Sequence, residues 1–396
     1  MIKNERVHVE CYARSLHKYN EELCGDKVEI RRNDESCIMV LADGLGSGVK
    51  ANILSTLTST IISEMIKEGA GIDEVVETIT ATLPECQERH VAYSTFTIMQ
   101  VFYDGTVKLV EFDNPETIVL RNKRALDLPR KIVKMGNRTI KLCEFKSVPN
   151  DFILFFSDGI IHAGIGSVLN LDWDHQQVKE HMLDYYRITD TAKDVTQILL
   201  ATINDLYQGH CGDDSTVATA KIVPATESCV MVGPPVRKED DVAVVNRLIR
   251  ANGKKICCGG TTSQIVSRVT GREMTMGSLE SLVADVPPMA YINGIDLVTE
   301  GVLTLQKVNA TLAECRRNQQ FMDELLFARG DDGASRMACM LLEECTRITF
   351  LVGCSDNPAH QSIAYSTISL NAKKRLIEKM ADNLEALGKI VSIEYY

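Results

Sequence analysis

The sequence predicts an α+β sandwich domain followed by a smaller α/β domain with a largely parallel sheet. The chain has 396 residues, which is too long for one ordinary domain. Up to about residue 222, strand-like runs are separated by polar turns and the helical stretches stand apart, whereas after residue 227 helices and short apolar strands alternate. Three prolines in "VPATESCVMVGPPVRKEDD" mark a boundary near 223 to 230. We therefore expect domains at residues 1–222 and 227–396.

The first domain opens with a predicted hairpin and two predicted helices. The runs "KVEIRR" and "SCIMVLAD" are joined by the turn "NDE". From Lys50 to Glu68 apolar residues recur at three and four positions, which predicts a helix, and "DEVVETITATL" repeats the pattern after Gly71. The apolar positions of the first helix are Ile53, Leu54, Leu57, Ile61, Ile62 and Met65.

Further strands and helices complete this domain. Short polar turns separate five strand-like runs, which predicts antiparallel meanders: "YSTFTIMQVFY", "TVKLVEF", "TIVLRN", "RKIVKM" and "TIKLCEF". After Pro149 come the apolar run "DFILFFSDGI", helical stretches between Asp174 and Tyr207, and a last strand in "GDDSTVATAKI". This order predicts sheets with the helices kept on the outside.

Composition excludes several classes of protein. The net charge is -11 and the Lys and Arg residues are scattered, which argues against a surface for nucleic acid. No apolar run approaches the ~18 to 20 residues that cross a bilayer, so we expect no membrane span. The thirteen cysteines show no CxxC pair and no zinc-type spacing, which favours reduced, buried thiols. We therefore expect a soluble, cytoplasmic protein.

Acidic residues recur at the ends of the predicted strands. Asp26 follows Gly25, Asp43 precedes Gly44, Asp158 lies in "SDG", and Asp213-Asp214 follows Gly212. Asp104-Gly105 is a contrast, because a short hairpin turn explains it completely. Carboxylates held on strand ends are the hard ligands that Mg²⁺ or Mn²⁺ requires. Without a cation they would repel one another, so the pattern predicts a metal cluster.

In this order, Gly25-Asp26, "ADGLGSGVKA", "FFSDGI" and "GDDSTVATAKI" resemble the metal-dependent serine/threonine protein phosphatases, and within them the bacterial stage II sporulation protein E branch. The resemblance covers residues 1 to 222. It implies a four-layer α-β-β-α sandwich, two Mn²⁺ or Mg²⁺ ions and a phosphorylated protein as substrate. By resemblance, Asp43 would bridge both metals, the Gly44 carbonyl would bind one, and Asp158 and Asp213 would complete the other site. Asp26 would support the cluster, and Asp214 is the alternative to Asp213 in the alignment.

The chemistry implied by the resemblance needs no nucleophilic side chain. A hydroxide bridging the two ions would attack phosphorus in line. None of the thirteen cysteines lies in an "HCxxGxxR" signature of the cysteine-dependent phosphatases. One departure from the family is that Leu45 follows Asp43-Gly44, where many eukaryotic members have a histidine. We interpret His162 and His210 as structural or solvated at least as readily as catalytic, and Ser47 as a helix N-cap.

The second domain carries a weaker candidate site. In "ICCGGTTSQIV" a strand leads into Gly259-Gly260 and then Thr261-Thr262 at a helix start, where free amides can bind an anion. A tight turn with a threonine cap is the equal alternative. Polar residues also follow strands in "DLVTEGVLTL" and "VGCSDNPAHQ", where open α/β sheets bind ligands. A regulatory domain for a small molecule or a protein partner is the expectation.

Three functional hypotheses follow. The first is a phosphoserine/phosphothreonine protein phosphatase in bacterial signalling, whose family substrates are phosphorylated regulators of the anti-sigma factor antagonist type. The second is a catalytically silent phosphatase-like module coupled to a sensing C-terminal domain. The third is a metal-dependent hydrolase of small phosphoesters. A homodimer is left open, and the sequence gives neither the native metal nor the source of the leaving-group proton.

Overall fold

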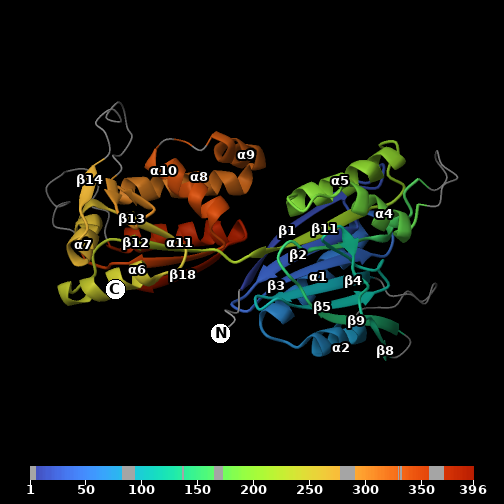
Figure 1. Ribbon diagram of the computed structural model, residues 1–396. Helices are drawn as coiled ribbons and strands as arrows, with labels where there is room; N and C mark the ends of the chain where they lie inside the picture. The colour runs from blue at the N-terminus through green and yellow to red at the C-terminus, as the bar shows by residue number, and fades with distance from the viewer. Residues whose placement is uncertain are drawn as a thin grey trace. The chain divides into compact units, whose positions relative to one another are not determined.

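The computed structural model describes residues 6–82, 94–135, 138–164, 173–276, 290–328, 330, 332–355 and 370–396. The chain divides into two compact units, residues 1–224 and 225–396 (Figure 1). Within the described ranges, no helix is both long enough and apolar enough to cross a membrane.

The first unit is built from two antiparallel sheets. One sheet has the strand order β1-β11-β10-β6-β7, and the other has the order β2-β3-β4-β5-β9-β8. The first contains β1 (Val7–Leu16), β6 (Ile118–Arg121), β7 (Arg124–Ala125), β10 (Phe152–Phe156) and β11 (Ser215–Pro224). The second contains β2 (Asp26–Arg32), β3 (Ser36–Gly44), β4 (Ser94–Phe102), β5 (Thr106–Phe112), β8 (Lys131–Met135) and β9 (Arg138–Lys146).

Helices cover the outer face of each sheet, which confirms the predicted layered fold (Figure 1). Apolar residues of β3 alternate toward α1 and α2, as Ile38, Val40 and Ala42 join the core that contains Ile62 and Val76. The other sheet packs its outer face on α4 and α5. The helices of this unit are α1 (Gly48–Lys67), α2 (Ile72–Thr82), α3 (Asp158–Ile161), α4 (His175–Tyr185) and α5 (Ala192–Leu206).

Helix α1 lies where the sequence predicts it, but its buried face differs from the predicted one. Ile53, Leu57 and Ile61 are 52%, 55% and 44% exposed, and Val49 lies on the same side at 62%. The face toward the sheet is made mainly of small residues: Gly48, Ala51, Ser55, Thr58, Ser59 and Ser63, together with Ile62 and Ile66. Apolar periodicity therefore located this helix without identifying its packed side.

The second unit is a seven-stranded sheet of mostly parallel strands, as predicted, in the order β14-β15-β16-β13-β12-β17-β18. Its strands are β12 (Glu227–Val232), β13 (Lys254–Cys258), β14 (Met274–Met276), β15 (Ala290–Ile292), β16 (Leu297–Thr299), β17 (Arg347–Val352) and β18 (Ile390–Tyr395). Only the pairs β14/β15 and β15/β16 are antiparallel within the described residues.

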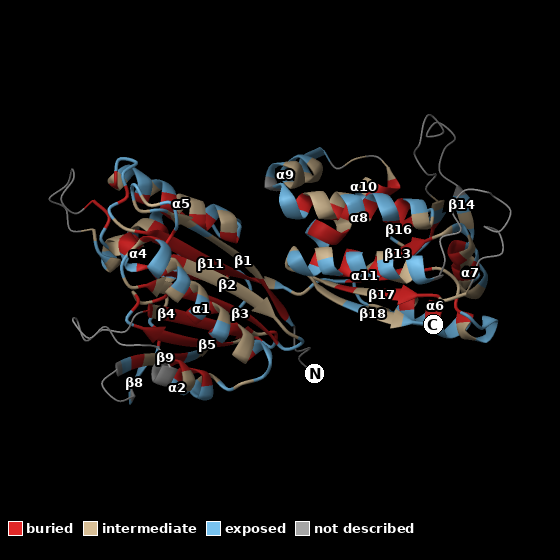
Figure 2. Cartoon of the chain, turned by 180° about the vertical axis from the view of Figure 1, so that it is seen from behind, coloured by how far each residue is buried: buried red, intermediate tan, exposed pale blue. Residues whose placement is uncertain are grey.

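Helices cover both faces of this second sheet, and Figure 2 shows their exposed sides turned away from its buried strands. One face packs on α6 (Asp241–Arg250) and α7 (Gly260–Thr270). The other packs on α8 (Val302–Arg317), α10 (Gly333–Cys339) and α11 (Leu370–Ala386), with α9 (Gln319–Ala328) alongside. A 3-10 turn (Lys238–Asp240) and a π-helical turn (Met340–Glu344) precede α6 and β17.

Two of the longer strands lie where the sequence analysis expected none. β1 has a polar sequence, "VHVECYARSL", yet pairs with β11 along its whole length. β12 lies inside the proline-containing segment that marks the predicted domain boundary, and it pairs with β13 on one side and β17 on the other. The prolines of this segment lie outside the strand, Pro224 before its first residue and Pro234 and Pro235 after its last, so none of them interrupts it.

Candidate metal centre at the strand ends

The centre of the site is the pair Asp26 and Asp43. They lie opposite each other in the antiparallel ladder of β2 and β3. Residues directly opposite in such a ladder have Cβ atoms ~5 Å apart, so the two carboxyl groups are close neighbours. Asp26 is buried, with 4% of its surface exposed, and Asp43 is partly buried.

Glycines allow the backbone to approach closely around this pair. A Cβ on Gly44 would lie 2.1 Å from the carbonyl oxygen of Ala51, which places the strand end directly against the first turns of α1. A Cβ on Gly159 would lie 2.1 Å from the carbonyl oxygen of Asp214. The Asp-Gly pairs therefore occur here because any larger residue would separate the elements that carry the acids.

Asp158 and Asp213 approach from the other sheet. Asp158 begins the short helix α3 directly after β10, and Asp213 precedes β11. The charge of Asp213 contributes to a raised pKa of Asp158, after burial, while the nearby His162 lowers it. The charges of both residues also raise the pKa of Asp43, so the four acids act on one another electrostatically. The topology thus brings together the strand ends that the sequence analysis singled out.

Asp214 differs from its neighbour Asp213. Its Oδ1 accepts a hydrogen bond from the Lys18 amide at 2.9 Å, and its Oδ2 accepts one from the Gly25 amide at 2.8 Å. Both oxygens are therefore used to tie the segment before β2 to the start of β11. Asp213 is more exposed, and its carboxylate lies 3.6 Å from the ammonium group of Lys18.

Burial and mutual repulsion raise the pKa values of Asp26, Asp43 and Asp158. Burial, and then the charge of Asp26, raise the pKa of Asp43 to about 9. Burial raises the pKa of Asp26 to about 6, while hydrogen bonds from Ser157 and Thr216 lower it. Raised carboxyl pKa values mean that negative charge is costly here, and a cation would remove that cost.

The donor set fits a hard divalent cation. Asp26 Oδ1 is buried without a hydrogen-bond partner, and a buried carboxylate oxygen without a partner is costly unless a cation or donor meets it. In the described parts of the chain no three His, Cys, Asp or Glu side chains converge on one metal position. Mg²⁺ is commonly held by one or two carboxylates with waters as its remaining ligands, so a carboxylate pair with outlying acids satisfies its chemistry.

Comparison with known proteins identifies the family of this unit. Residues 33–223 match the sequence model of the family "Stage II sporulation protein E (SpoIIE)". The sporulation protein E domain is therefore present. This match confirms the resemblance stated from the motifs, and it includes Asp43, Asp158, Asp213 and Asp214 but begins after Asp26.

Individual relatives of the SpoIIE domain are distant. "Phosphoserine phosphatase RsbX" of Bacillus subtilis (strain 168) is 29% identical over 73 residues, which are 18% of this chain and 36% of that protein. The chain thus spans about a third of this curated relative. Among solved structures, the phosphatase domain with a fragment of the regulatory domain of SpoIIE from Bacillus subtilis has a TM-score of 0.48 at 18% identity, with 56% of this chain and 65% of that chain covered. RsbX in complex with magnesium gives 0.39 at 15% identity, covering 54% and 96%.

The SpoIIE domain contains one site residue that the motifs did not single out. The Ser157 hydroxyl donates to Asp26 Oδ2 at 2.7 Å and accepts from the Thr216 amide at 2.9 Å. It therefore connects the end of β10 and the start of β11 with the acid on β2. Its place directly before Asp158 was the available signal, but a serine there is also a common helix N-cap.

Ser47 and the two histidines of the SpoIIE domain can now be placed. Ser47 occupies the N-cap position of α1 but makes no cap hydrogen bond, and its hydroxyl instead donates to Glu21 Oε1 at 2.9 Å. His162 lies close enough to Asp158 to affect its pKa. His210 stacks edge-on against Tyr19 with ring centroids 4.4 Å apart.

Outside the SpoIIE domain, the predicted anion turn forms the start of α7. Gly259 has a φ of +113° and its amide donates to the Thr299 carbonyl, so that amide is already used. The Thr262 hydroxyl accepts from the Gly233 amide at 3.0 Å. Gly260 and Thr261 complete the turn, and whether it holds an anion remains a prediction.

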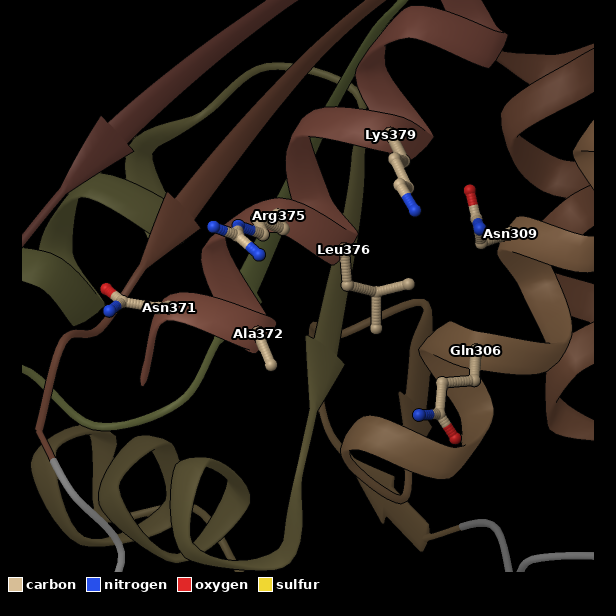
Figure 3. Close-up of a pocket in the computed structure, with 7 residues that line it drawn as sticks. All are labelled: Gln306, Asn309, Asn371, Ala372, Arg375, Leu376 and Lys379. Carbon is tan, nitrogen blue, oxygen red and sulfur yellow. The ribbon is translucent and has the colours of Figure 1, made fainter. Parts of the chain in front are cut away.

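A separate groove of about 510 Å³ lies between α8 and α11. Figure 3 shows Lys379, Leu376 and Ala372 of α11 facing Gln306 and Asn309 of α8, with Arg375 and Asn371 at the far side. None of the residues of the predicted anion turn lines this groove.

Proposed function

We propose that this protein is a metal-dependent protein phosphatase that hydrolyses phosphoserine and phosphothreonine. The observation that carries the proposal is the facing pair Asp26 and Asp43, with Asp158 and Asp213 acting on it electrostatically, inside a domain of the SpoIIE family. Clustered acids with raised pKa values at the ends of rigid strands are an arrangement that costs stability, and such arrangements concentrate at functional sites.

Each residue has a defined part in the proposed site. Asp43 would contact two Mn²⁺ or Mg²⁺ ions, the Gly44 carbonyl would bind one of them, and Asp158 and Asp213 would hold the other. Bound there, the two ions would lower the pKa of an attacking water and neutralise charge on the phosphoryl oxygens. Asp26 supports Asp43 from the next strand.

The remaining residues position these ligands. Ser157 orients Asp26 through its hydrogen bond to Oδ2, and Oδ1 stays buried without a hydrogen-bond partner. Asp214 accepts hydrogen bonds from the backbone amides of Lys18 and Gly25. We therefore propose that Asp214 positions the backbone and that Asp213 is the metal ligand. Leu45 stands where a proton donor would be needed, so we propose that solvent protonates the leaving group.

The proposed substrate is a phosphorylated regulatory protein in a bacterial cytoplasm. RsbX is named as a phosphoserine phosphatase, which supports the substrate class. The second unit is proposed to be regulatory, through a small molecule or a protein partner. The competing hypothesis is a silent SpoIIE-type module, and the retention of all four acids speaks against it.

Turnover measurements test the proposal. We expect wild-type protein to hydrolyse a small chromogenic phosphate ester with Mn²⁺, and a phosphoserine protein faster than the small ester. Asp43→Asn should reduce the rate by several orders of magnitude with the fold intact. Asp104→Asn is the matched control, because its carboxylate accepts from the Thr106 amide and pairs with the exposed Lys146 in a hairpin turn. No turnover by wild type would support the silent module, and full turnover by Asp43→Asn would exclude the metal assignment.

A further inference from the structure

Two cysteine thiols meet between the sheets of the first unit, at some distance from the acids. The Sγ atoms of Cys11 on β1 and Cys37 on β3 are 3.5 Å apart. Of the twelve described cysteines, these are the two whose thiol groups contact each other. Cys37 shows no exposed surface, whereas Cys11 is partly exposed. The pair thus joins strands of different sheets and has one side accessible to solvent.

A guanidinium group completes this cluster. Arg32 lies opposite Cys37 in the β2/β3 ladder. Its Nη2 donates to the Val9 carbonyl at 2.9 Å, and its Nε is buried without a hydrogen-bond partner. No carboxylate forms an ion pair with Arg32 among the described residues, in contrast to the neighbouring Arg31, which pairs with Glu29 and Glu64. A buried cation needs a nearby negative charge, and the thiols are the adjacent groups that can supply it.

The electrostatics agree with this geometry. The hydrogen bond with Cys11, and then the charge of Arg32, lower the pKa of Cys37 to about 7. The same hydrogen bond raises the pKa of Cys11, so the pair releases its first proton at a lower pH than its second. Burial instead raises the pKa of other cysteines, such as Cys24 and Cys257, each to about 12. Reactive cysteines are those beside a cation and partly exposed, whereas buried apolar ones are inert.

We propose that Cys11 and Cys37 are a covalent modification site, an oxidisable dithiol that hydrogen peroxide converts into a disulfide bond between the two sheets. The thiolate of the pair displaces hydroxide from the peroxide and becomes a sulfenic acid. The second sulfur then attacks that sulfur, the S–O bond breaks, and the oxygen leaves as water. Two thiols and one peroxide give one disulfide and two water molecules. Cys37 supplies the thiolate, and Cys11, the partly exposed residue of the two, supplies the second sulfur.

The bond would join the sheets without touching the proposed metal centre. Cys37 and Asp43 are six residues apart on β3. They therefore lie on the same face of the strand but roughly 20 Å from each other. The closed loop spans 26 positions of sequence and includes all of β2. We therefore expect the disulfide to raise the thermal midpoint of the full chain by roughly 5 °C or more, independently of phosphatase activity.

Peptide mapping tests the site. Full-length protein is treated with hydrogen peroxide in modest molar excess, its free thiols are alkylated, and it is digested without reduction. The expected result is a linked pair of peptides that contains Cys11 and Cys37, lacks two hydrogen atoms, and separates on reduction. Alkylation of both residues after peroxide treatment, or their oxidation to sulfonic acid without linkage, would overturn the proposal.

Variants separate reactivity from folding. Arg32→Gln should slow formation of the disulfide by about tenfold or more, because it removes the cation beside the thiols. Arg31→Gln is the matched control one residue away and should leave the rate unchanged. Cys11→Ser and Cys11→Ala should each abolish the linked peptides and the thermal shift. The comparison of reduced with peroxide-treated wild-type protein needs no variant, so it can refute the proposal even if a variant does not fold. Equal rates of disulfide formation in both arginine variants would also refute it.

Discussion

The repelling carboxyl groups at the metal centre predict an unusual pH dependence of stability. In the presence of a chelator, the pKa of Asp43 rises from 3.8 in the unfolded chain to about 9 in the native state. A raised carboxyl pKa contributes stability that is complete below pH ~4 and is lost as the pH rises through the folded value. Metal-free protein should therefore become less stable from pH 5 to pH 8, which is the opposite of the usual behaviour of a paired aspartate.

The magnitude follows from the number of protons held. One proton bound in the native state and absent from the unfolded state changes the free energy of unfolding by about 1.4 kcal/mol per pH unit. Three units give about 4 kcal/mol from Asp43, and Asp26, with a pKa of about 6, adds to the slope only below that pH. Relaxation of the structure and entry of water into the site reduce this free-energy change. We therefore expect the measured free energy of unfolding to fall by about 2 to 4 kcal/mol from pH 5 to pH 8.

The Asp43→Asn variant tests this reasoning. Asparagine carries no proton to lose, so the slope between pH 5 and pH 8 should largely disappear. The assay is chemical denaturation with chelator at several pH values. Asp104→Asn is the control, because hydrogen bonds from Thr106 lower the pKa of Asp104 to about 2 and its contribution is constant above pH 5. A flat wild-type profile, or the same slope in wild type and Asp43→Asn, would refute the reasoning.

Three further predictions concern the same unit. Gly44→Ala should cost roughly 2 to 4 kcal/mol of stability in denaturant unfolding, since its Cβ would lie 2.1 Å from the Ala51 carbonyl oxygen, and wild-type stability would contradict this. Ser157→Ala should lower Mn²⁺-dependent turnover by about tenfold with an unchanged far-UV spectrum, whereas Ser147→Ala, whose hydroxyl donates to the Gly105 carbonyl, should not. The fragment 1–224 should unfold cooperatively alone and differ from the full chain in basal turnover, and identical rates would count against regulation by the second unit.

The elements that the sequence predicted are those whose pattern is local. "SCIMVLAD" is apolar on both faces and became β3, which is buried along most of its length. The acids were found because each lies at the end of a predicted strand next to a glycine, a signal contained within three residues. Asp43 and Asp158 precede the glycine, and Asp26 and Asp213 follow it. The domain arrangement and the family followed from the order of these short signals.

The features that were missed depend on contacts between distant segments. β1 alternates polar and apolar residues weakly, and its partner β11 lies some 200 residues later in the chain. Ser157 acquires its importance only because the fold places Asp26 within 2.7 Å. The contact between Cys11 and Cys37 likewise depends on how two sheets face each other. No pattern within a single window of sequence contains these pairings.

Because the packed side of α1 carries small residues, its contact with the sheet tolerates smaller side chains but not larger ones. Ser55 and Ser59 are fully buried, and the Ser59 hydroxyl donates to the Ser55 carbonyl of its own helix, so neither forms a bond that anchors the helix to β3. Replacing either by alanine removes one oxygen and leaves almost no void. Replacing either by leucine would force the helix away from the strand that ends in Asp43 and Gly44. At Ser55 and Ser59 the packed face of α1 therefore accepts small side chains alone, a restriction that the exposed face does not share.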